Sequence, residues 1–225
     1  MQGTDVYGVL KQIGVTNLYH ANSVTTSCTF LEQGGLVSRG FVEDRGLKQT
    51  AQFSDESDKN NGIWHRIFLD HVDIHDRAGG KNHYGPVLFQ LDLDILLRLA
   101  PRTEILVTRK NPVHWDRSDP DSERWFRSKD VLARRIHFGD FDKMLVIKIP
   151  SEKLDFPNGR ALIILDDPQR KLSSGKNAYN HAKNRLKATV SPIDASIEHR
   201  ECRRGCRCAR EYAEDTIEEI NVYFS

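Results

Sequence analysis

The chain has 225 residues, of which 38% are apolar and 29% are charged, and its formal net charge is +1 at pH 7. This length and composition predict one globular domain with a hydrophobic core of its own. No run of about 18 apolar residues occurs, which argues against a transmembrane helix. Residues 1–16 lack the basic and then apolar pattern of a signal peptide. We therefore expect a cytoplasmic protein.

Charged residues are distributed unevenly along the chain. Residues 168–210 hold eleven Lys or Arg against three acidic residues, whereas residues 211–225 hold five acidic residues and no basic one. A local basic excess can neutralise phosphate groups, so the first of these segments is a candidate nucleic-acid surface. The alternative interpretation is a solvated helix face that binds nothing.

Three of the four cysteines stand close together near the C-terminus: Cys202, Cys206 and Cys208, with Cys28 far from them. Together with His199 they would supply the four sulfur or nitrogen ligands that zinc prefers. Their spacing does not match a standard zinc knuckle, and the neighbouring arginines favour a basic helical surface instead. We therefore expect no metal.

The first elements follow from hydrophobic periodicity and from capping residues. Residues 5–14 are predicted to form a helix with Val6, Leu10 and Ile13 on one face. Residues 16–21 are predicted to form a strand. Residues 23–35 are predicted to form a helix that begins at Ser23 or Thr25 and ends at a double glycine. Residues 38–62 are polar and rich in turn formers, which predicts a long surface loop.

Strand patterns dominate the middle of the chain. Apolar or alternating runs predict strands at residues 63–75, 84–96, 103–110, 142–150 and 160–168. Residues 111–141 form a second long insertion, and residues 175–188 and 210–224 have helical patterns. The fold class is therefore α+β, with about six strands in mixed or antiparallel pairing.

His20 is the most informative residue of the first half. It stands at the end of a predicted strand and is followed by Asn22 and Ser23, whose side chains can bind a ribose. The double glycine after the next helix permits positive φ angles and a close approach of the following segment. Strand–helix units of this kind are common, so these residues alone indicate only a candidate nucleotide contact.

The order of elements around His20 resembles the DarT-like ADP-ribosyltransferases, bacterial toxins that attach ADP-ribose to nucleic-acid bases. That family has a "YH-x-(T/S)" strand and then a helix closed by "G-x-L-L", and here "LYHANS" and "GGLV" match at the same separation. The resemblance covers about residues 17–165. It implies an ADP-ribosyltransferase-like core with a split mixed or antiparallel β-sheet flanked by helices, and residues 166–225 would be a basic helical extension of this single domain.

The resemblance also implies a set of NAD contacts. His20, Ala21 and Asn22 would contact the nicotinamide and its ribose, and Thr29 and Val37 would line the same pocket. An arginine of the following loop would hold the NAD phosphates and assist catalysis. Arg45 in "VEDRG" is our first choice, and Arg39 is the alternative.

The acceptor would be read by the loop at residues 108–142. Trp115, Trp125 and Arg127 lie in this loop and would stack on and clamp an extruded base. Phosphate contacts from the basic C-terminal segment would position the nucleic acid without reading its sequence.

The chain departs from the family at one catalytic position. Cleavage of the nicotinamide–ribose bond develops positive charge at the anomeric carbon, which a carboxylate stabilises. The family places a glutamate at the start of the fourth strand, where this chain has Lys143. Either the neighbouring Asp142 takes this role, which requires a shift of one residue in strand register, or the chain is an inactivated variant. We favour the second interpretation; a surface lysine in a salt bridge is the structural alternative.

A different enzyme class is suggested by "FLDHVDIHD". His71, Asp73 and His75 alternate and would share one face of a strand, where they could bind a divalent ion. This would indicate a metal-dependent nuclease or phosphohydrolase. Otherwise these residues line a cleft or face solvent.

The function predicted from the sequence is mono-ADP-ribosylation of a nucleic-acid base with NAD as co-substrate, with DNA preferred over RNA as acceptor. The resemblance implies a toxin of a bacterial toxin–antitoxin or phage-defence system, and with it a cognate antitoxin protein as partner. A domain that binds nucleic acid without catalysis, through the basic C-terminal segment alone, is a further alternative.

Overall fold

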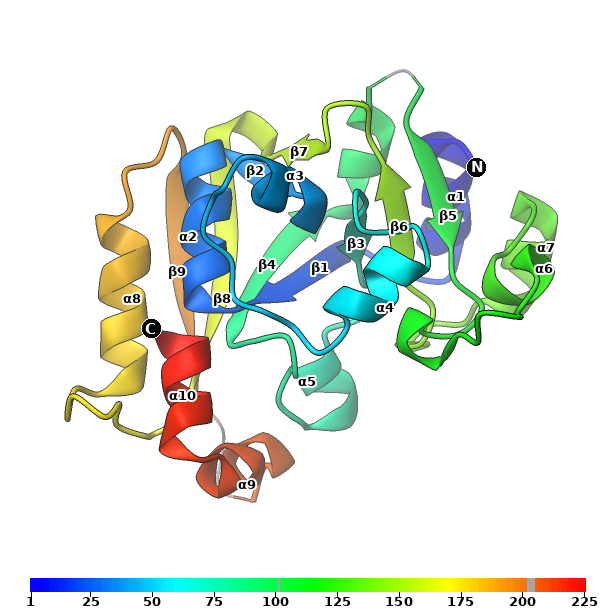
Figure 1. Ribbon diagram of the computed structural model, residues 1–225. Helices are drawn as coiled ribbons and strands as arrows, with labels where there is room; N and C mark the ends of the chain where they lie inside the picture. The colour runs from blue at the N-terminus through cyan, green and yellow to red at the C-terminus, as the bar shows by residue number, and fades with distance from the viewer. Residues whose placement is uncertain (101, 202–204) are drawn as a thin grey trace.

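A computed structural model describes residues 1–100, 102–201 and 205–225 of the chain. The fold is α+β, as predicted, and its largest sheet is mixed (Figure 1). This sheet has the order β1-β4-β8-β9, formed by Asn17–Asn22, Val87–Asp92, Arg160–Asp167 and Asp194–Glu201. The β1–β4 and β4–β8 pairs are antiparallel, and β8 and β9 run parallel.

Two smaller antiparallel sheets complete the strand structure of the described residues. One has the order β3-β6-β5, formed by Ile67–Leu69, Leu145–Lys148 and Glu104–Val107. The other pairs β2 with β7, formed by Gly35–Val37 and Lys153–Asp155. Tyr19 of β1 and Asp70, which follows β3, form an antiparallel bridge. The two larger sheets therefore meet at this pair, directly beside His20.

Helices pack at both ends of the sheets (Figure 1). At the β8–β9 end, α2 (Val24–Gln33), α8 (Ala178–Ala188) and α10 (Ile217–Phe224) contact one another. At the β5 end, α1 (Gly3–Gln12) contacts β5, the 3₁₀ helix η1 (Leu93–Arg98) and α7 (Lys129–Arg135). The remaining short helices are α3 (Arg39–Asp44), α4 (Asp55–Asn60), α5 (Ile74–Ala78), η2 (Pro112–His114), α6 (Asp121–Arg124), η3 (Pro157–Gly159) and α9 (Arg207–Glu214).

The segment around α2 forms as the sequence predicts. Ser23, not Thr25, is the N-cap, and its side chain accepts a hydrogen bond from the backbone N–H of Thr26. Gly34 ends the helix at φ 71°, a left-handed conformation that favours glycine. Gly35 then starts β2, where a Cβ atom would lie 2.4 Å from the carbonyl oxygen of Leu154. The two glycines thus have separate roles, one for the turn and one for close strand packing.

Other predictions need correction. The expected loop at residues 38–62 contains the helices α3 and α4, and the expected strand at 63–75 shortens to β3 and is followed by α5. The helical pattern at 210–224 is split into α9 and α10. The strand β9 replaces part of the expected basic helical extension, because Asp194–Glu201 pairs along the whole length of β8. The short strands β2 and β7 were not predicted.

None of the helices in the described part of the chain combines the length and the apolar character that a membrane span requires.

Candidate functional site

A pocket lies at the junction of the two larger sheets. Residues from β1, β2, α3, α4, β3 and the loops at 84 and 111–113 line it. They are His20, Ala21, Asn22, Phe30, Val37, Arg39, Gln52, Ser54, Asp58, Arg66, Ile67, Phe68, Asp70, Tyr84, Asn111, Pro112, Val113 and Met144. The structure thus brings together five residues that the sequence assigned to an NAD pocket: His20, Ala21, Asn22, Val37 and Arg39.

His20 is held in the pocket wall as a neutral imidazole. Its Nδ1 lies 2.7 Å from the carbonyl oxygen of Phe68, which can only accept, so Nδ1 carries the proton and Nε2 is left as an acceptor. Asn22 Nδ2 lies 3.4 Å from that Nε2. Burial lowers the pKa of His20 to about 4, and the Arg39 charge acts in the same direction. The ring can therefore accept a hydrogen bond at neutral pH.

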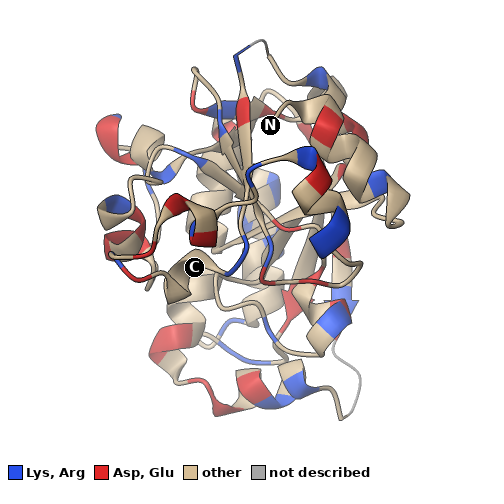
Figure 2. Cartoon of the chain, turned by 90° about the vertical axis from the view of Figure 1, so that its right-hand side faces the viewer, with Lys and Arg blue, Asp and Glu red and all other residues tan. Residues whose placement is uncertain are grey.

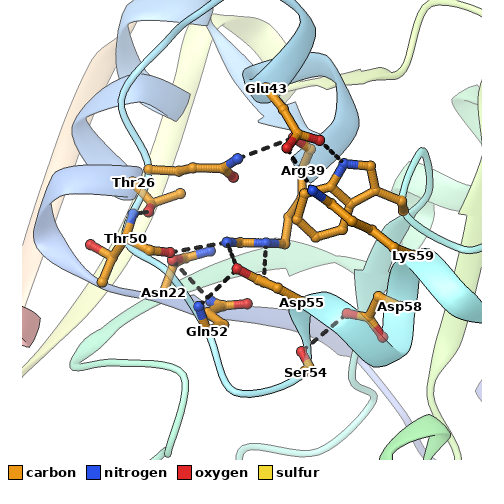
Figure 3. A network of polar contacts seen from close by, with 12 residues as sticks. Asn22, Thr26, Arg39, Glu43, Thr50, Gln52, Ser54, Asp55, Asp58 and Lys59 are labelled. Atoms are coloured by element: carbon orange, nitrogen blue, oxygen red, sulfur yellow. Dashed lines mark hydrogen bonds and ion pairs between the residues drawn. The ribbon is translucent and has the colours of Figure 1, made fainter.

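Arg39 is a buried cation of the pocket, which Arg66 also lines. Its Nε and Nη2 lie 2.7 Å from the two carboxylate oxygens of Asp55, and Nη2 also donates to the carbonyl of Thr50 at 3.0 Å (Figure 3). The guanidinium lies 5.2 Å from the ring centroid of Trp64, within cation–π range. Its Nη1 is buried and has no hydrogen-bond partner in the described part of the chain. The Nη1 group of the guanidinium is thus left as a hydrogen-bond donor for a ligand.

The loop that carries these contacts is fixed to α2 by hydroxyl groups. Thr29 donates to the carbonyl of Lys48 at 2.6 Å. Thr26 accepts from the backbone N–H of Thr50 at 2.9 Å (Figure 3). Gln52 then donates to Asn22 at 3.2 Å. Thr29 therefore does not line the pocket as predicted; it supports the loop that does.

Two acidic residues of the pocket differ in their surroundings. Asp58 on α4 accepts a hydrogen bond from Ser54 at 3.0 Å, and burial raises its pKa to about 6. Burial also raises the pKa of Asp70 to about 7, with a further contribution from the charge of Asp73. Neither residue was singled out by the sequence: Asp58 is one of several acidic residues in a polar segment, and Asp70 follows a short apolar run with no motif around it.

A wider groove adjoins the pocket and shares Asp70, Tyr84, Asn111, Val113 and Met144 with it. Its other walls carry aromatic and basic side chains, among them Phe53, Lys81, His83, His114, Phe141 and Arg207. Phe53 is exposed and stacks on Tyr84, with ring centroids 5.2 Å apart and planes inclined by 26°. The groove therefore offers an aromatic surface directly beside the pocket.

Arg45, our first choice for the phosphate-binding residue, lies elsewhere. It caps the C-terminus of α3, is exposed, and places its guanidinium 3.6 Å from the ring centroid of Phe41. It lines neither the pocket nor the groove. Of the two arginines considered from the sequence, Arg39 is the one in the pocket.

The expected carboxylate position at the start of the fourth strand also lies outside the pocket. Lys143 forms an ion pair with Asp140 at 2.7 Å, as in the alternative interpretation of this residue as a lysine in a salt bridge. It lines neither the pocket nor the groove. Asp142 is exposed and lines the groove only. Met144 is the first residue of this segment that reaches the pocket.

The expected base-reading residues form a small packed unit. Trp115 and Trp125 meet edge to face at 4.6 Å and pack against the cluster of Ile63, Met144 and Val146. Trp115 donates to the carbonyl of Lys110 at 3.1 Å. These two tryptophans and the exposed Arg127 line neither the pocket nor the groove.

The alternation of His71, Asp73 and His75 does not place them on one strand face. Asp73 is the N-cap of α5 and pairs with Arg200, whereas His71 is buried and His75 lies on the helix. Within residues 1–100, 102–201 and 205–225, no group of three or more His, Cys, Asp or Glu side chains is arranged to hold a metal ion. The metal-enzyme alternative therefore has no geometric support there.

The candidate zinc ligands that the structure describes do not form a metal-binding group. His199 pairs with Asp167 at 3.0 Å, Cys206 contacts the carbonyl of Gly79 at 3.3 Å, and Cys208 is buried. Cys202 lies outside the described residues.

Some arginines of the basic C-terminal segment make ion pairs and hydrogen bonds within the protein. Arg200 pairs with Asp73 and Asp166, and Arg170 donates to the carbonyls of Tyr212, Ala213 and Asp215 at the end of α9. Lys176, which precedes α8, and Arg185 on α8 line a shallow depression. On the side of the molecule seen in Figure 2, basic and acidic segments are interspersed along the chain.

Comparison of the chain with protein-family models and with curated protein sequences finds no match.

Proposed function

We propose that this protein is an NAD-dependent mono-ADP-ribosyltransferase that modifies a nucleic-acid base, with single-stranded DNA as the first acceptor to test. The observation that carries the proposal is that one pocket is lined both by a neutral His20 and by Arg39, whose Nη1 has no partner among the described residues. The first is an acceptor that has only a long contact with Asn22 and suits a ribose hydroxyl, and the second is a donor of a buried guanidinium, paired with Asp55 on its other side, that suits a phosphate.

The junction of two sheets beside His20 supports the same proposal, because the resemblance implies a split sheet around the NAD site. The groove beside the pocket adds an aromatic surface on which a base can stack. In this function Asn22 and Gln52 would orient the nicotinamide ribose, and Arg39 would hold a phosphate. The toxin role and a cognate antitoxin partner belong to this proposal.

A thermal-shift titration with NAD is the first test. A ligand that binds only the folded state must stabilise it, by about 2.7 kcal/mol at a concentration of a hundred times its Kd. Incubation with NAD labelled in its adenylate group, and with single-stranded DNA and RNA oligonucleotides, then tests transfer. Absence of both a thermal shift and a labelled oligonucleotide would contradict the proposal. A thermal shift without transfer would support a protein that binds NAD but does not modify nucleic acid.

A further inference from the structure

Asp70 is fixed at the point where the two larger sheets meet. Its backbone N–H donates to the carbonyl of Tyr19 at 2.8 Å, and its carbonyl accepts from the N–H of Tyr19 at 2.8 Å. Tyr19 directly precedes His20, so this bridge holds Asp70 next to the strand that carries the imidazole. Arg66, Ile67 and Phe68 of the preceding segment line the pocket together with Asp70.

Asp70 lines both cavities, so it lies in the wall that the pocket and the groove share. A reacting group in the pocket and an acceptor in the groove would meet at this wall. Asp58 lines only the pocket, and Asp142 lines only the groove. Position therefore distinguishes Asp70 from the other two candidate carboxylates.

The carboxylate of Asp70 is also available for a ligand. No hydrogen bond or ion pair of its side chain is found among the residues that the structure describes. By contrast, Asp55 is paired with Arg39, and Asp58 accepts from Ser54. Asp70 is half-buried, and a carboxylate that loses hydration without gaining a partner is costly for stability; such groups concentrate at functional sites. Burial raises the pKa of Asp70 to about 7, where a carboxylate serves well as a general base near neutral pH.

We propose that Asp70 is the catalytic carboxylate of this transferase and that the acceptor base enters through the groove; this inference rests on the function proposed above. The bond between C1′ of the nicotinamide ribose and the nicotinamide nitrogen breaks, and its electron pair leaves with nicotinamide. The ionised Asp70 stabilises the positive charge that develops at C1′. A nitrogen of the acceptor base then bonds to C1′, and its proton passes to Asp70 and on to solvent.

This assignment explains how the chain can function with lysine at position 143. The carboxylate is supplied from the end of β3 and not from the start of β6. The lysine and its ion pair with Asp140 then belong to the structure of the loop before β6. Under this inference the chain needs no glutamate at position 143 for activity.

The experiment compares the unaltered chain with Asp70→Asn, Asp70→Glu, Asp142→Asn and Asp94→Asn. Asp94 is exposed and lines neither cavity, so the same chemical change there is the matched control. Transfer from labelled NAD to an oligonucleotide is measured across pH 5–9, and the thermal shift with NAD is measured for each variant. We expect Asp70→Asn to lose at least about a hundredfold in kcat, the usual contribution of a general base, and to keep its thermal shift with NAD. Asp94→Asn should match the unaltered chain.

The pH profile separates catalysis from structural support. In the unaltered chain the transfer rate should rise with pH as Asp70 ionises, and this rise should be absent from the residual activity of Asp70→Asn. Asp70→Glu should retain the rise and regain part of the rate. Transfer by Asp70→Asn within threefold of the unaltered chain, or loss of transfer in Asp142→Asn alone, would overturn the role of Asp70 and leave the transferase intact. Absence of transfer by the unaltered chain would overturn both.

Discussion

Arg39 and Asp55 form a two-point ion pair that joins the first residue of α3 to the first residue of α4. Both Arg39–Asp55 contacts are 2.7 Å long, and the side chains are mostly buried, at 11% and 25% exposure. The pair fixes both ends of the loop between α3 and α4, and Gln52 of this loop donates a hydrogen bond to Asn22. This pair also orients the guanidinium so that Nη1 remains unpaired. One interaction therefore organises both the loop and the proposed phosphate contact.

The first prediction distinguishes the two arginines considered from the sequence. Arg39→Lys keeps the charge but removes the planar fork, so it should weaken NAD binding by about tenfold to a hundredfold, the loss expected for hydrogen bonds to a charged group. Arg45→Lys, the matched change at an exposed position, should leave the affinity unchanged. Isothermal titration with NAD measures both. Equal losses in the two variants, or a loss only in Arg45→Lys, would contradict the assignment of Arg39.

The second prediction concerns the protonation of His20. Its pKa in the folded state, about 4, lies below its ordinary value of 6.5, so the unfolded state binds the proton more strongly. The contribution of His20 to stability is therefore fully present above pH 6.5 and is lost as the pH falls from there to about 4. The loss should amount to about 3 kcal/mol.

Urea unfolding of the unaltered chain and of His20→Gln at pH 7.5 and pH 4.5 checks this expectation. Glutamine does not titrate, so the variant should not lose this contribution at the lower pH. The free energy of unfolding of the unaltered chain, minus that of His20→Gln, should therefore be smaller at pH 4.5 than at pH 7.5. A difference that is independent of pH would show that the ring is not held neutral.

The third prediction concerns the stability cost of Asp70. Its raised pKa means that the folded state binds the proton more strongly, so stability falls as the pH rises from about 4 to about 7. Asp70→Asn removes the partly desolvated charge and should therefore stabilise the protein at pH 8, by about 2 to 4 kcal/mol, and have little effect at pH 4. Charged or titratable groups that line the same two cavities are His20, Arg39, Asp58, Arg66, Lys81, His83, Tyr84, His114, Asp142, Arg207 and Glu211.

Thermal unfolding of Asp70→Asn and of the control Asp94→Asn at these two pH values gives the measurement. A stabilised but inactive Asp70→Asn protein would have the property expected of a catalytic group that is retained at a cost in stability. A decrease in stability of Asp70→Asn at pH 8 would show that the carboxylate has a structural partner.

The sequence predicted the parts of the fold that depend on local chemistry. Ser23 and Gly34 define the two ends of α2 through capping, and the apolar runs at β4, β6 and β8 became strands. The class α+β followed from these elements, whereas the choice between mixed and antiparallel pairing did not, because the one parallel pair of the described sheets involves β9. His20, Ala21, Asn22, Val37 and Arg39 line one pocket, because the short β1–α2–β2 connection leaves little freedom in their arrangement.

The remaining features depend on contacts between distant segments. Asp194–Glu201 has too few apolar residues to be recognised as a strand, and it forms one because β8 offers a free edge for parallel pairing. Asp70 became a candidate only when its bridge to Tyr19 brought β3 beside β1. Arg45 was preferred over Arg39 because the pattern does not show which arginine of the segment is turned inward. The tryptophans of the 111–141 insertion were assigned to a substrate, whereas they pack on each other.

The last prediction separates these tryptophans from the aromatic residues of the groove. Phe53 is 66% exposed and stacks on Tyr84 at the groove. Removal of one base-stacking ring costs about 1 to 3 kcal/mol of binding, so Phe53→Ala should raise the KM for the oligonucleotide by roughly fivefold to a hundredfold. The unfolding temperature should be almost unchanged, because the ring is mostly exposed.

Trp125→Ala should instead lower the free energy of unfolding by about 2 kcal/mol through lost packing, and leave the KM for the oligonucleotide near that of the unaltered chain. Steady-state transfer kinetics and thermal unfolding of both variants measure these effects. An increased KM in Trp125→Ala together with an unchanged KM in Phe53→Ala would contradict the prediction and place the acceptor at the 111–141 insertion, away from the groove.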